Sequence, residues 1–479
     1  MKTFLELLRD SALSIVFHVA PRFANVLIFI LIGRLAGPDQ AGIFSLATTY
    51  LLIVTTIMRG LDDLLIRQVA REPDRAAGYY ANFLALRLVF SAMLYVALIF
   101  IVQVVLNYAD TTSGPILVLT LSVLPDSLAF VAQSVLLGQR RFGAPAAILG
   151  GANVFKLIIG TIVLLRGGSL MDIAWIWLIG SGLAMIVLLF VAMKQIGGLR
   201  ATDWLDFSPL KTHWRTALSF TAITVLTALD SQTDTVLLSI FRSEAEIGWY
   251  GAATTITFSL LMLAQAYRFA VYPLMTRHAQ HAPERLARLY HKSMHYMGVV
   301  AMPMVVGIIV LAQPIVLLIF GPKFLPTVPV LQVLIVSLLF FFLSEPCNRV
   351  MLVKDRQRMT LGFLSVSAST NVVLNLMLIP KFGAVGAATA RVCSATLYFM
   401  LNYGYVSRKL VRNADLKSLI RPAIATAIMA ACAIVMMASH VVINIAISAC
   451  VYFAALWGVR GIQREDANLL RDALTRRFR

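Results

Sequence analysis

Basic residues occupy alternate gaps between the long apolar runs of this 479-residue chain. Thirty of its 41 Lys and Arg residues fall in, or within four residues of, every second gap, five fall in the gaps between those, and the other six lie deeper inside the runs. A membrane-spanning helix needs about 20 mainly apolar residues, and positively charged loops stay on the cytoplasmic side. The alternation therefore predicts a multi-pass membrane protein with both termini in the cytoplasm.

The apolar runs are continuous and lack residue-by-residue alternation, which favours helices and predicts an all-α fold. Hydrophobic residues make up 59% of the chain and charged residues 13%, about half the share of a soluble domain. The net charge of +18 is spread over many short loops, so attraction to anionic lipids explains it better than nucleic-acid binding. Fourteen spans are expected, at 11–33, 40–60, 79–106, 115–137, 143–165, 172–195, 216–241, 248–274, 293–313, 325–353, 358–379, 384–407, 418–438 and 441–460.

A short internal repeat divides the predicted spans into two sets. The segments 41–49 (AGIFSLATT) and 247–255 (IGWYGAATT) share a Gly, an aromatic residue two positions later and Ala-Thr-Thr, at an offset of 206 residues. Paired homologous halves are common in transporters. The repeat predicts a six-helix bundle over 1–196, a cytoplasmic linker over 197–215, a second six-helix bundle over 216–410, and two extra helices with a basic tail over 411–479.

Six cations lie inside the apolar runs, where an unpaired charge costs roughly 2.5 kcal/mol or more at the bilayer centre. They are Arg22, Arg87, Lys156, Arg268, Arg349 and Arg391. Intramembrane charges are functional candidates by default. These six residues are therefore the main clue to function.

The first span carries a polar stripe. Ser14, His18, Arg22 and Asn25 recur at helical spacing and share one face. The stripe is consistent with a cavity wall in which Arg22 binds an anion, because a guanidinium makes bidentate, charge-assisted hydrogen bonds to phosphate. The alternative is an Arg that pairs internally and holds helices together.

Three motifs resemble those of the Wzx-like polysaccharide-export flippases, a branch of the multidrug/oligosaccharidyl-lipid/polysaccharide exporter superfamily. They are RLAGPDQAG (34–42), FGPKF (320–324) and NVVLNLMLIPKFGAVGAA (371–388). The resemblance covers essentially the whole chain. It implies a V-shaped pair of six-helix bundles around a central cavity that moves an undecaprenyl-pyrophosphate-linked oligosaccharide across the bacterial inner membrane. It also implies polysaccharide polymerase and chain-length proteins as partners, and no cofactor.

The resemblance suggests which cations bind the substrate. In related lipid II flippases, arginines on spans one, two and eight line the cavity, and Arg22, Arg59 and Arg268 lie on the matching spans. His18 and Asn25 join them as candidates through the stripe on span one. Arg59 and Arg268 could instead extend to the membrane surface, as long basic side chains do near helix ends.

Acidic residues offer partners for other cations. Asp126 and Lys156 lie at similar depths, which is consistent with a buried pair or with a sugar-phosphate contact by Lys156. Glu345 and Arg349 have the i,i+4 spacing at which opposite charges meet, so they are predicted to form a structural ion pair.

The predicted seventh span carries two further acids, Asp230 and Asp234, together with Thr227 and Ser231 on one face. They could bind a coupling Na⁺ or H⁺, or pair with the buried cations. The four cysteines lack metal-ligand spacing, and the histidines near residue 280 lie on a basic loop, so no metal site is predicted.

Two other functions are open to such a chain. A cation-coupled multidrug extruder of the same superfamily usually has twelve spans and a more acidic cavity. A membrane polysaccharide polymerase or ligase usually has a long external loop with catalytic residues, and no predicted external gap here exceeds about ten residues. The sequence therefore favours a flippase and not an enzyme.

Overall fold

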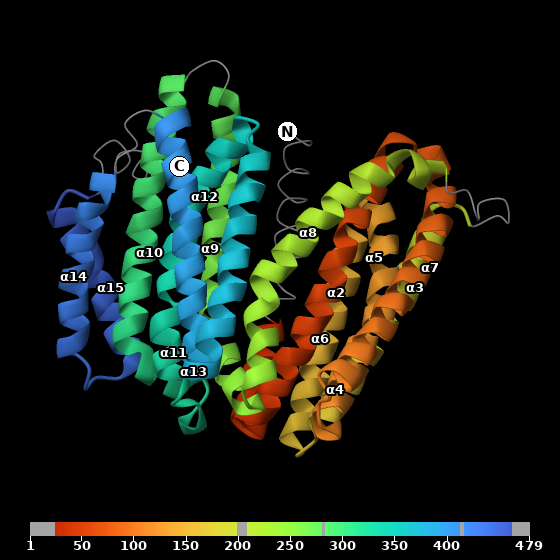
Figure 1. The fold of residues 1–479 in the computed structure, drawn as a ribbon, viewed down its shortest axis with the longest axis horizontal. Helices are drawn as coiled ribbons and strands as arrows, with labels where there is room; N and C mark the ends of the chain where they lie inside the picture. The colour runs from red at the N-terminus through yellow and green to blue at the C-terminus, as the bar shows by residue number, and fades with distance from the viewer. Residues whose placement is uncertain (1–23, 199–207, 280–282, 412–415, 462–479) are drawn as a thin grey trace, which may run out of the picture. The chain divides into compact units, whose positions relative to one another are not determined.

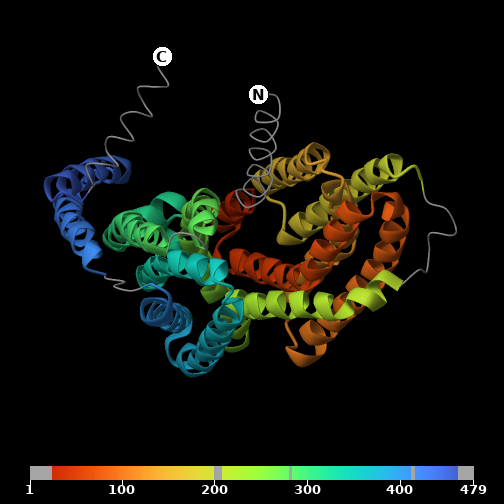
Figure 2. The same ribbon diagram turned by 90° about the horizontal axis from the view of Figure 1, so that it is seen from above.

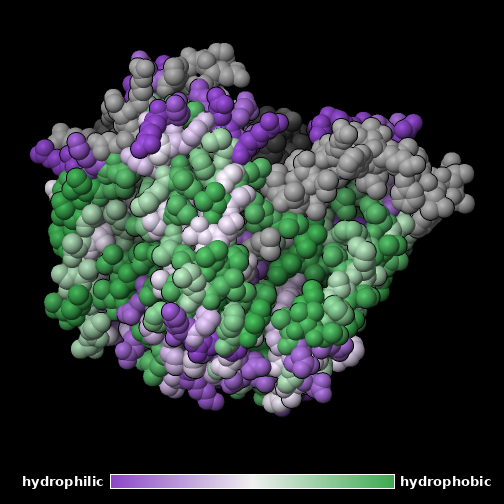
Figure 3. Space-filling model, in the orientation of Figure 1, coloured by the Kyte–Doolittle hydropathy of each residue, from purple (hydrophilic) through white to green (hydrophobic). Residues whose placement is uncertain are grey.

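The computed structural model describes residues 24–198, 208–279, 283–411 and 416–461, and all regular elements in these ranges are helical. Eleven of the described helical segments are long and apolar enough to cross a membrane. Apolar side chains cover the middle of the helices, and hydrophilic side chains gather toward their ends (Figure 3). The chain is therefore an all-α, multi-pass membrane protein.

The chain divides into two compact units, residues 1–251 and 252–479 (Figure 1). The first contains the apolar helix Ala24–Ala36 and the helices α2 (Pro38–Arg71), α3 (Ala76–Phe100), α4 (Asp110–Leu121), α5 (Val123–Gly138), α6 (Gly143–Leu165), α7 (Leu170–Gln195) and α8 (Ser208–Phe241). Helix α9 (Glu244–Ala279) begins in the first unit and continues into the second. The second also contains α10 (Pro283–Ile319), α11 (Thr327–Leu334), α12 (Val336–Val353), α13 (Gln357–Tyr405), α14 (Ile420–Val435) and α15 (Val441–Gly458).

Helix α13 is a hairpin of two helical legs that meet at a kink. Gly383 has φ 56° and ψ −135°, a backbone conformation that residues with a Cβ rarely adopt. Pro380 lies three residues earlier and removes a helical N–H donor. The sequence predicts two spans, 358–379 and 384–407, on either side of this position, so one long helix in the structure corresponds to two predicted spans.

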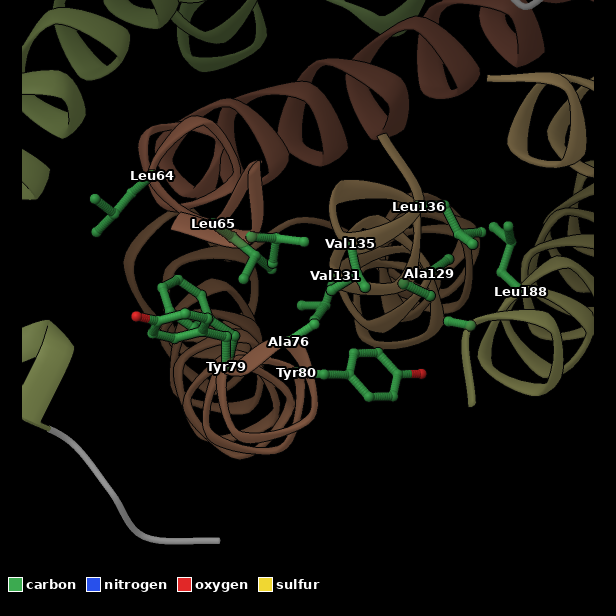
Figure 4. Close-up of a cluster of buried hydrophobic side chains, with 14 residues drawn as sticks. Leu64, Leu65, Ala76, Tyr79, Tyr80, Ala129, Val131, Val135, Leu136 and Leu188 are labelled. Atoms are coloured by element: carbon green, nitrogen blue, oxygen red, sulfur yellow. The ribbon is translucent and has the colours of Figure 1, made fainter. Parts of the chain in front are cut away.

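The core of the first unit lies between α2, α3, α5 and α7 (Figure 4). Its members include the fully buried Leu65, Tyr80, Val131 and Leu188. Side chains of this size each contribute about 1.5–3 kcal/mol when they leave water. In a membrane, contacts inside the bundle compete with lipid, so close packing holds these helices together.

The glycines that correspond in the sequence repeat, Gly42 and Gly248, contact each other. A Cβ on Gly42 would lie 1.8 Å from the carbonyl oxygen of Glu244, and a Cβ on Gly248 would lie 2.1 Å from that of Pro38. The first turns of α2 and α9 therefore cross with their backbones in contact. Only glycine fits at these two positions. The two glycines that the sequence repeat aligns therefore meet in this crossing.

The turn between α8 and α9 is also tied to the loop before α4. The Tyr108 hydroxyl lies 2.6 Å from Ser239 Oγ and 3.0 Å from the Tyr50 hydroxyl. Thr112 donates a hydrogen bond of 3.0 Å to Glu244 Oε1. Burial raises the pKa of Tyr108, which keeps its phenol protonated for this network. These bonds join the end of α8 and the start of α9 to α2 and α4 within the first unit.

Helices α14 and α15 pack against each other and against α10 (Figures 1 and 2). On α10, His295 Nδ1 lies 2.9 Å from the carbonyl oxygen of Ser418, and His295 Nε2 lies 2.7 Å from the carbonyl oxygen of Gly461. Tyr452 donates a hydrogen bond of 2.6 Å to the carbonyl of Val299. These bonds join α10 to the segment before α14, to α15 and to Gly461 beyond the end of α15.

Candidate functional site

The polar stripe of the first predicted span lies mostly outside the described residues. Ser14, His18 and Arg22 precede residue 24, and Asn25 is exposed on the helix Ala24–Ala36. The roles predicted for His18, Arg22 and Asn25 in substrate binding stay predictions.

The other two arginines of the predicted substrate set lie on α2 and α9. Arg59 is exposed in the C-terminal half of α2. Arg268 lies within α9, and its side chain is outside the described part of the structure. The exposure of Arg59 is consistent with contact with a substrate or with the membrane surface.

Lys156 is enclosed by α6 and α7 in the first unit. Its side chain is 8% exposed, and its Nζ donates a hydrogen bond of 2.8 Å to Ser181 Oγ. The same Nζ lies 5.2 Å from the centre of the Trp177 ring, within the range of a cation–π contact. Gly180 gives the lysine stem room, because a Cβ there would lie 2.8 Å from Lys156 Cε and Cγ.

Asp126 on α5 belongs to the same cluster. Its carboxylate interacts electrostatically with the Lys156 ammonium and with the Ser181 hydroxyl. No direct ion pair joins Asp126 and Lys156 in the part of the chain that the structure describes. The two residues lie within electrostatic reach of each other, and the direct hydrogen bond of Lys156 goes to Ser181.

The acids predicted as coupling-ion candidates lie on α8. Asp234 is 2% exposed and accepts a hydrogen bond of 2.6 Å from the Tyr250 hydroxyl. Asp230 is half-buried one turn earlier and also has an interaction partner. Tyr250 belongs to the second copy of the repeat, so Asp234 links α8 to the start of α9.

Glu345 and Arg349 on α12 lie side by side. Glu345 Oε2 and Arg349 Nε are 3.6 Å apart, and both side chains are about one-sixth exposed. The geometry agrees with the i,i+4 spacing and with a structural role.

Arg87 has a partner that the sequence did not reveal. Its guanidinium pairs directly with Asp62 of α2, and Arg87 itself is 1% exposed. Asp62 is 25 residues away and lies in a gap predicted to face the cytoplasm, so no helical spacing relates the two. The structure shows that α2 extends to Arg71 and carries Asp62 into the helix bundle.

A second polar set missed in the sequence joins the two legs of α13. Ser367 Oγ donates to the carbonyl of Ser394 at 2.9 Å, and Asn375 donates to Asn371 Oδ1 at 3.0 Å. Arg391 is 2% exposed and lies three residues before Ser394, whose hydroxyl donates to the Arg391 carbonyl. Asn371 and Asn375, which lie in the motif at 371–388, therefore belong to a buried polar seam within one hairpin.

The described residues contain no group of three or more His, Cys, Asp or Glu side chains that could hold a metal ion. Of the histidines near residue 280, His278 and His281 lie outside the described side chains. His295 instead serves the contact with α14 and α15.

Comparison with known proteins gives one family and a set of distant relatives. Residues 31–329 match the family model described as "Polysaccharide biosynthesis protein". The chain is 22% identical over 406 residues to a probable low-salt glycan biosynthesis flippase, Agl15, of Haloferax volcanii, covering 82% of this chain and 81% of the relative. A probable flippase of the same organism, AglR, is 29% identical over 170 residues, covering 34% of this chain and 35% of the relative.

The fold is similar to solved transporters. A structure of the lipid II flippase MurJ in an inward closed conformation superimposes with a TM-score of 0.77 at 15% identity, covering 96% of this chain and all of the other. An inward-facing multidrug transporter of the MATE family superimposes with a TM-score of 0.69 at 12% identity, covering 82% of this chain and 98% of the other. At these identities the likeness concerns the fold alone.

Proposed function

Since the chain belongs to the polysaccharide biosynthesis protein family, which consists of transporters and not of enzymes, we propose that it moves a lipid-linked glycan across a membrane. The match over residues 31–329 is the observation that carries this proposal. The flippase names of the relatives Agl15 and AglR and the fold shared with a lipid II flippase support it.

The substrate in this proposal is an oligosaccharide linked to undecaprenyl pyrophosphate, and the membrane is the bacterial inner membrane. Both follow from the resemblance to Wzx-like flippases. The chain has fourteen spans in two six-helix bundles, with α14 and α15 as an addition, and both termini face the cytoplasm. The two relatives from Haloferax volcanii are archaeal. The carrier lipid is therefore tested directly with an undecaprenyl-pyrophosphate-linked substrate in vesicles.

The diphosphate binds to Arg22, Arg59 and Arg268 in an alternating-access cycle, with His18 and Asn25 beside Arg22. A pyrophosphate carries several charged oxygens, and guanidinium groups replace its lost hydration with charge-assisted hydrogen bonds. The glycan and the diphosphate cross inside the protein while the prenyl tail stays in lipid. Substrate binding to one conformation more tightly than to the other shifts the equilibrium between them.

The test is export of the surface polysaccharide in a deletion strain that carries the wild-type gene, Arg22→Ala, Arg59→Ala or Arg268→Ala. We expect wild type to restore export and each variant to reduce it at normal protein level. Arg166→Ala is the matched control, because Arg166 is exposed at the end of α6 in a gap predicted to be external. Full export by all three variants would refute the cationic site, and failure of wild type to restore export would refute the function.

A further inference from the structure

In the cluster of Lys156, Ser181, Asp126 and Trp177, the ammonium is hydrogen-bonded to a hydroxyl and not directly to the carboxylate. Lys156 Nζ can only donate, so Ser181 Oγ accepts in their 2.8 Å bond. The Ser181 hydroxyl keeps its own proton to donate. The Asp126 carboxylate lies within electrostatic reach of the Lys156 ammonium and of the hydroxyls of Ser181 and Ser122, so the cluster places a carboxylate near a buried ammonium without direct contact.

The cluster lies deep in the first unit. Lys156 and Ser181 are near the middle of α6 and α7, Ser181 is fully buried, and Asp126 is near the middle of the span Asp110–Gly138. Trp177 covers the ammonium and packs edge-on against Phe44 of α2, with ring centres 5.5 Å apart. The cluster is therefore shielded from water on the side of α7 and α2.

Other charged side chains on the neighbouring helices are placed elsewhere. Asp172 and Lys194 lie at the two ends of α7, and Asp110 begins α4. On α2, Asp62 pairs with Arg87, and Arg59 is exposed. The remaining charged residues with described side chains on α2 and on the helix Ala24–Ala36 lie toward helix ends, and they are Arg34, Asp39, Arg67 and Arg71.

We propose that the Lys156–Ser181–Asp126 cluster is a proton-binding site through which the transport cycle responds to a proton gradient. With one proton to share, it holds an ammonium and a carboxylate, or an amine and a carboxylic acid after that proton passes from Lys156 to Asp126. Uptake of one proton from water gives an ammonium and a carboxylic acid. The cluster then gains one positive charge, with no oxidation and no other bond changed.

This added charge determines which conformation of the transporter the proton favours. A net positive cluster in the first unit favours a conformation that holds an anion, and a bound anion in turn favours the proton, because linkage between two ligands is reciprocal. The role in transport rests on the proposed function, whereas proton binding itself does not. The two can therefore be tested separately.

The first test is infrared difference spectroscopy of the purified wild-type protein in lipid vesicles, recorded as the pH is lowered. We expect a carbonyl band of a buried carboxylic acid to appear, to be lost in Asp126→Asn, and to shift in Ser181→Ala. Gly180→Ala displaces the Lys156 stem and should also shift the band. Gly182→Ala on the same helix should leave it unchanged, because a Cβ there meets nothing within 4 Å. An unchanged spectrum in Asp126→Asn would overturn the proposal.

The second test measures translocation of a lipid-linked oligosaccharide in the same vesicles with and without a pH gradient. Wild type should respond to the gradient, and Asp126→Asn should lose the response while it still translocates. A response to the gradient that survives in Asp126→Asn would overturn the coupling role. If neither the wild type nor any variant translocates the substrate but the wild type shows the carboxyl band, the proton-binding site is supported and the proposed function is refuted.

Discussion

Two buried cations in the first unit are held in opposite ways. Arg87, near the middle of α3, pairs directly with Asp62 in the C-terminal part of α2. Lys156 donates to a hydroxyl, faces an aromatic ring and meets its carboxylate only at longer range. A direct pair is satisfied in one protonation state. The pair of Lys156 and Asp126 beside Ser181, called here the serine-linked pair, has several protonation states. The position of a cation inside a membrane segment therefore does not by itself indicate a ligand site. The groups that neutralise its charge distinguish a structural cation from a functional one.

The largest expected effect is the loss of the direct pair. Arg87→Ala leaves the Asp62 carboxylate without its main partner, and breaking a buried pair in this way costs about 3–5 kcal/mol. We expect low protein level and a large fall in the melting temperature of the detergent-solubilised protein. The double variant Asp62→Asn/Arg87→Gln should recover much of the loss. Equal instability of the single and double variants would show that packing, and not charge, accounts for the effect.

A smaller effect on stability is expected at the serine-linked pair. Lys156→Met keeps the length of the stem and its contact with Trp177, and Asp126 can remain neutral by holding a proton. We expect a stability loss of about 1–2 kcal/mol, near the usual cost of one substitution, with the gradient response of transport abolished. Thermal unfolding measured beside transport checks both. A collapse as severe as that of Arg87→Ala would erase the distinction between the two cations.

The smallest effect is expected at Glu345 and Arg349 of the second unit. They are neighbours on one helix, 3.6 Å apart, and such i,i+4 pairs contribute little, so Glu345→Gln, which keeps the size of the side chain, should cost less than about 1 kcal/mol. Melting temperature is again the measurement, with Arg349→Gln as the partner variant. A loss comparable to that of Arg87→Ala would place this pair with the scaffold pairs.

The sequence predicted the helical class, a boundary between two spans at residues 380–383, where α13 turns, and the closeness of Asp126 to Lys156. These follow from hydropathy and from depth in a span, which are local properties of the chain. The Asp62–Arg87 pair was missed because α2 continues past the end of its apolar run. The repeat around Gly42 and Gly248 was visible, but the contact between these two glycines depends on how helices cross, which spacing along one chain does not determine.

The most direct test of the account uses purified protein in vesicles loaded with a fluorescent undecaprenyl-pyrophosphate-linked oligosaccharide. The fraction of substrate that becomes accessible to an externally added glycan-cleaving enzyme is followed over time. We predict that wild type brings substrate from the inner to the outer leaflet, and that Arg22→Ala and Arg268→Ala are slow. Accessibility no faster than in protein-free vesicles would contradict the proposed flippase function.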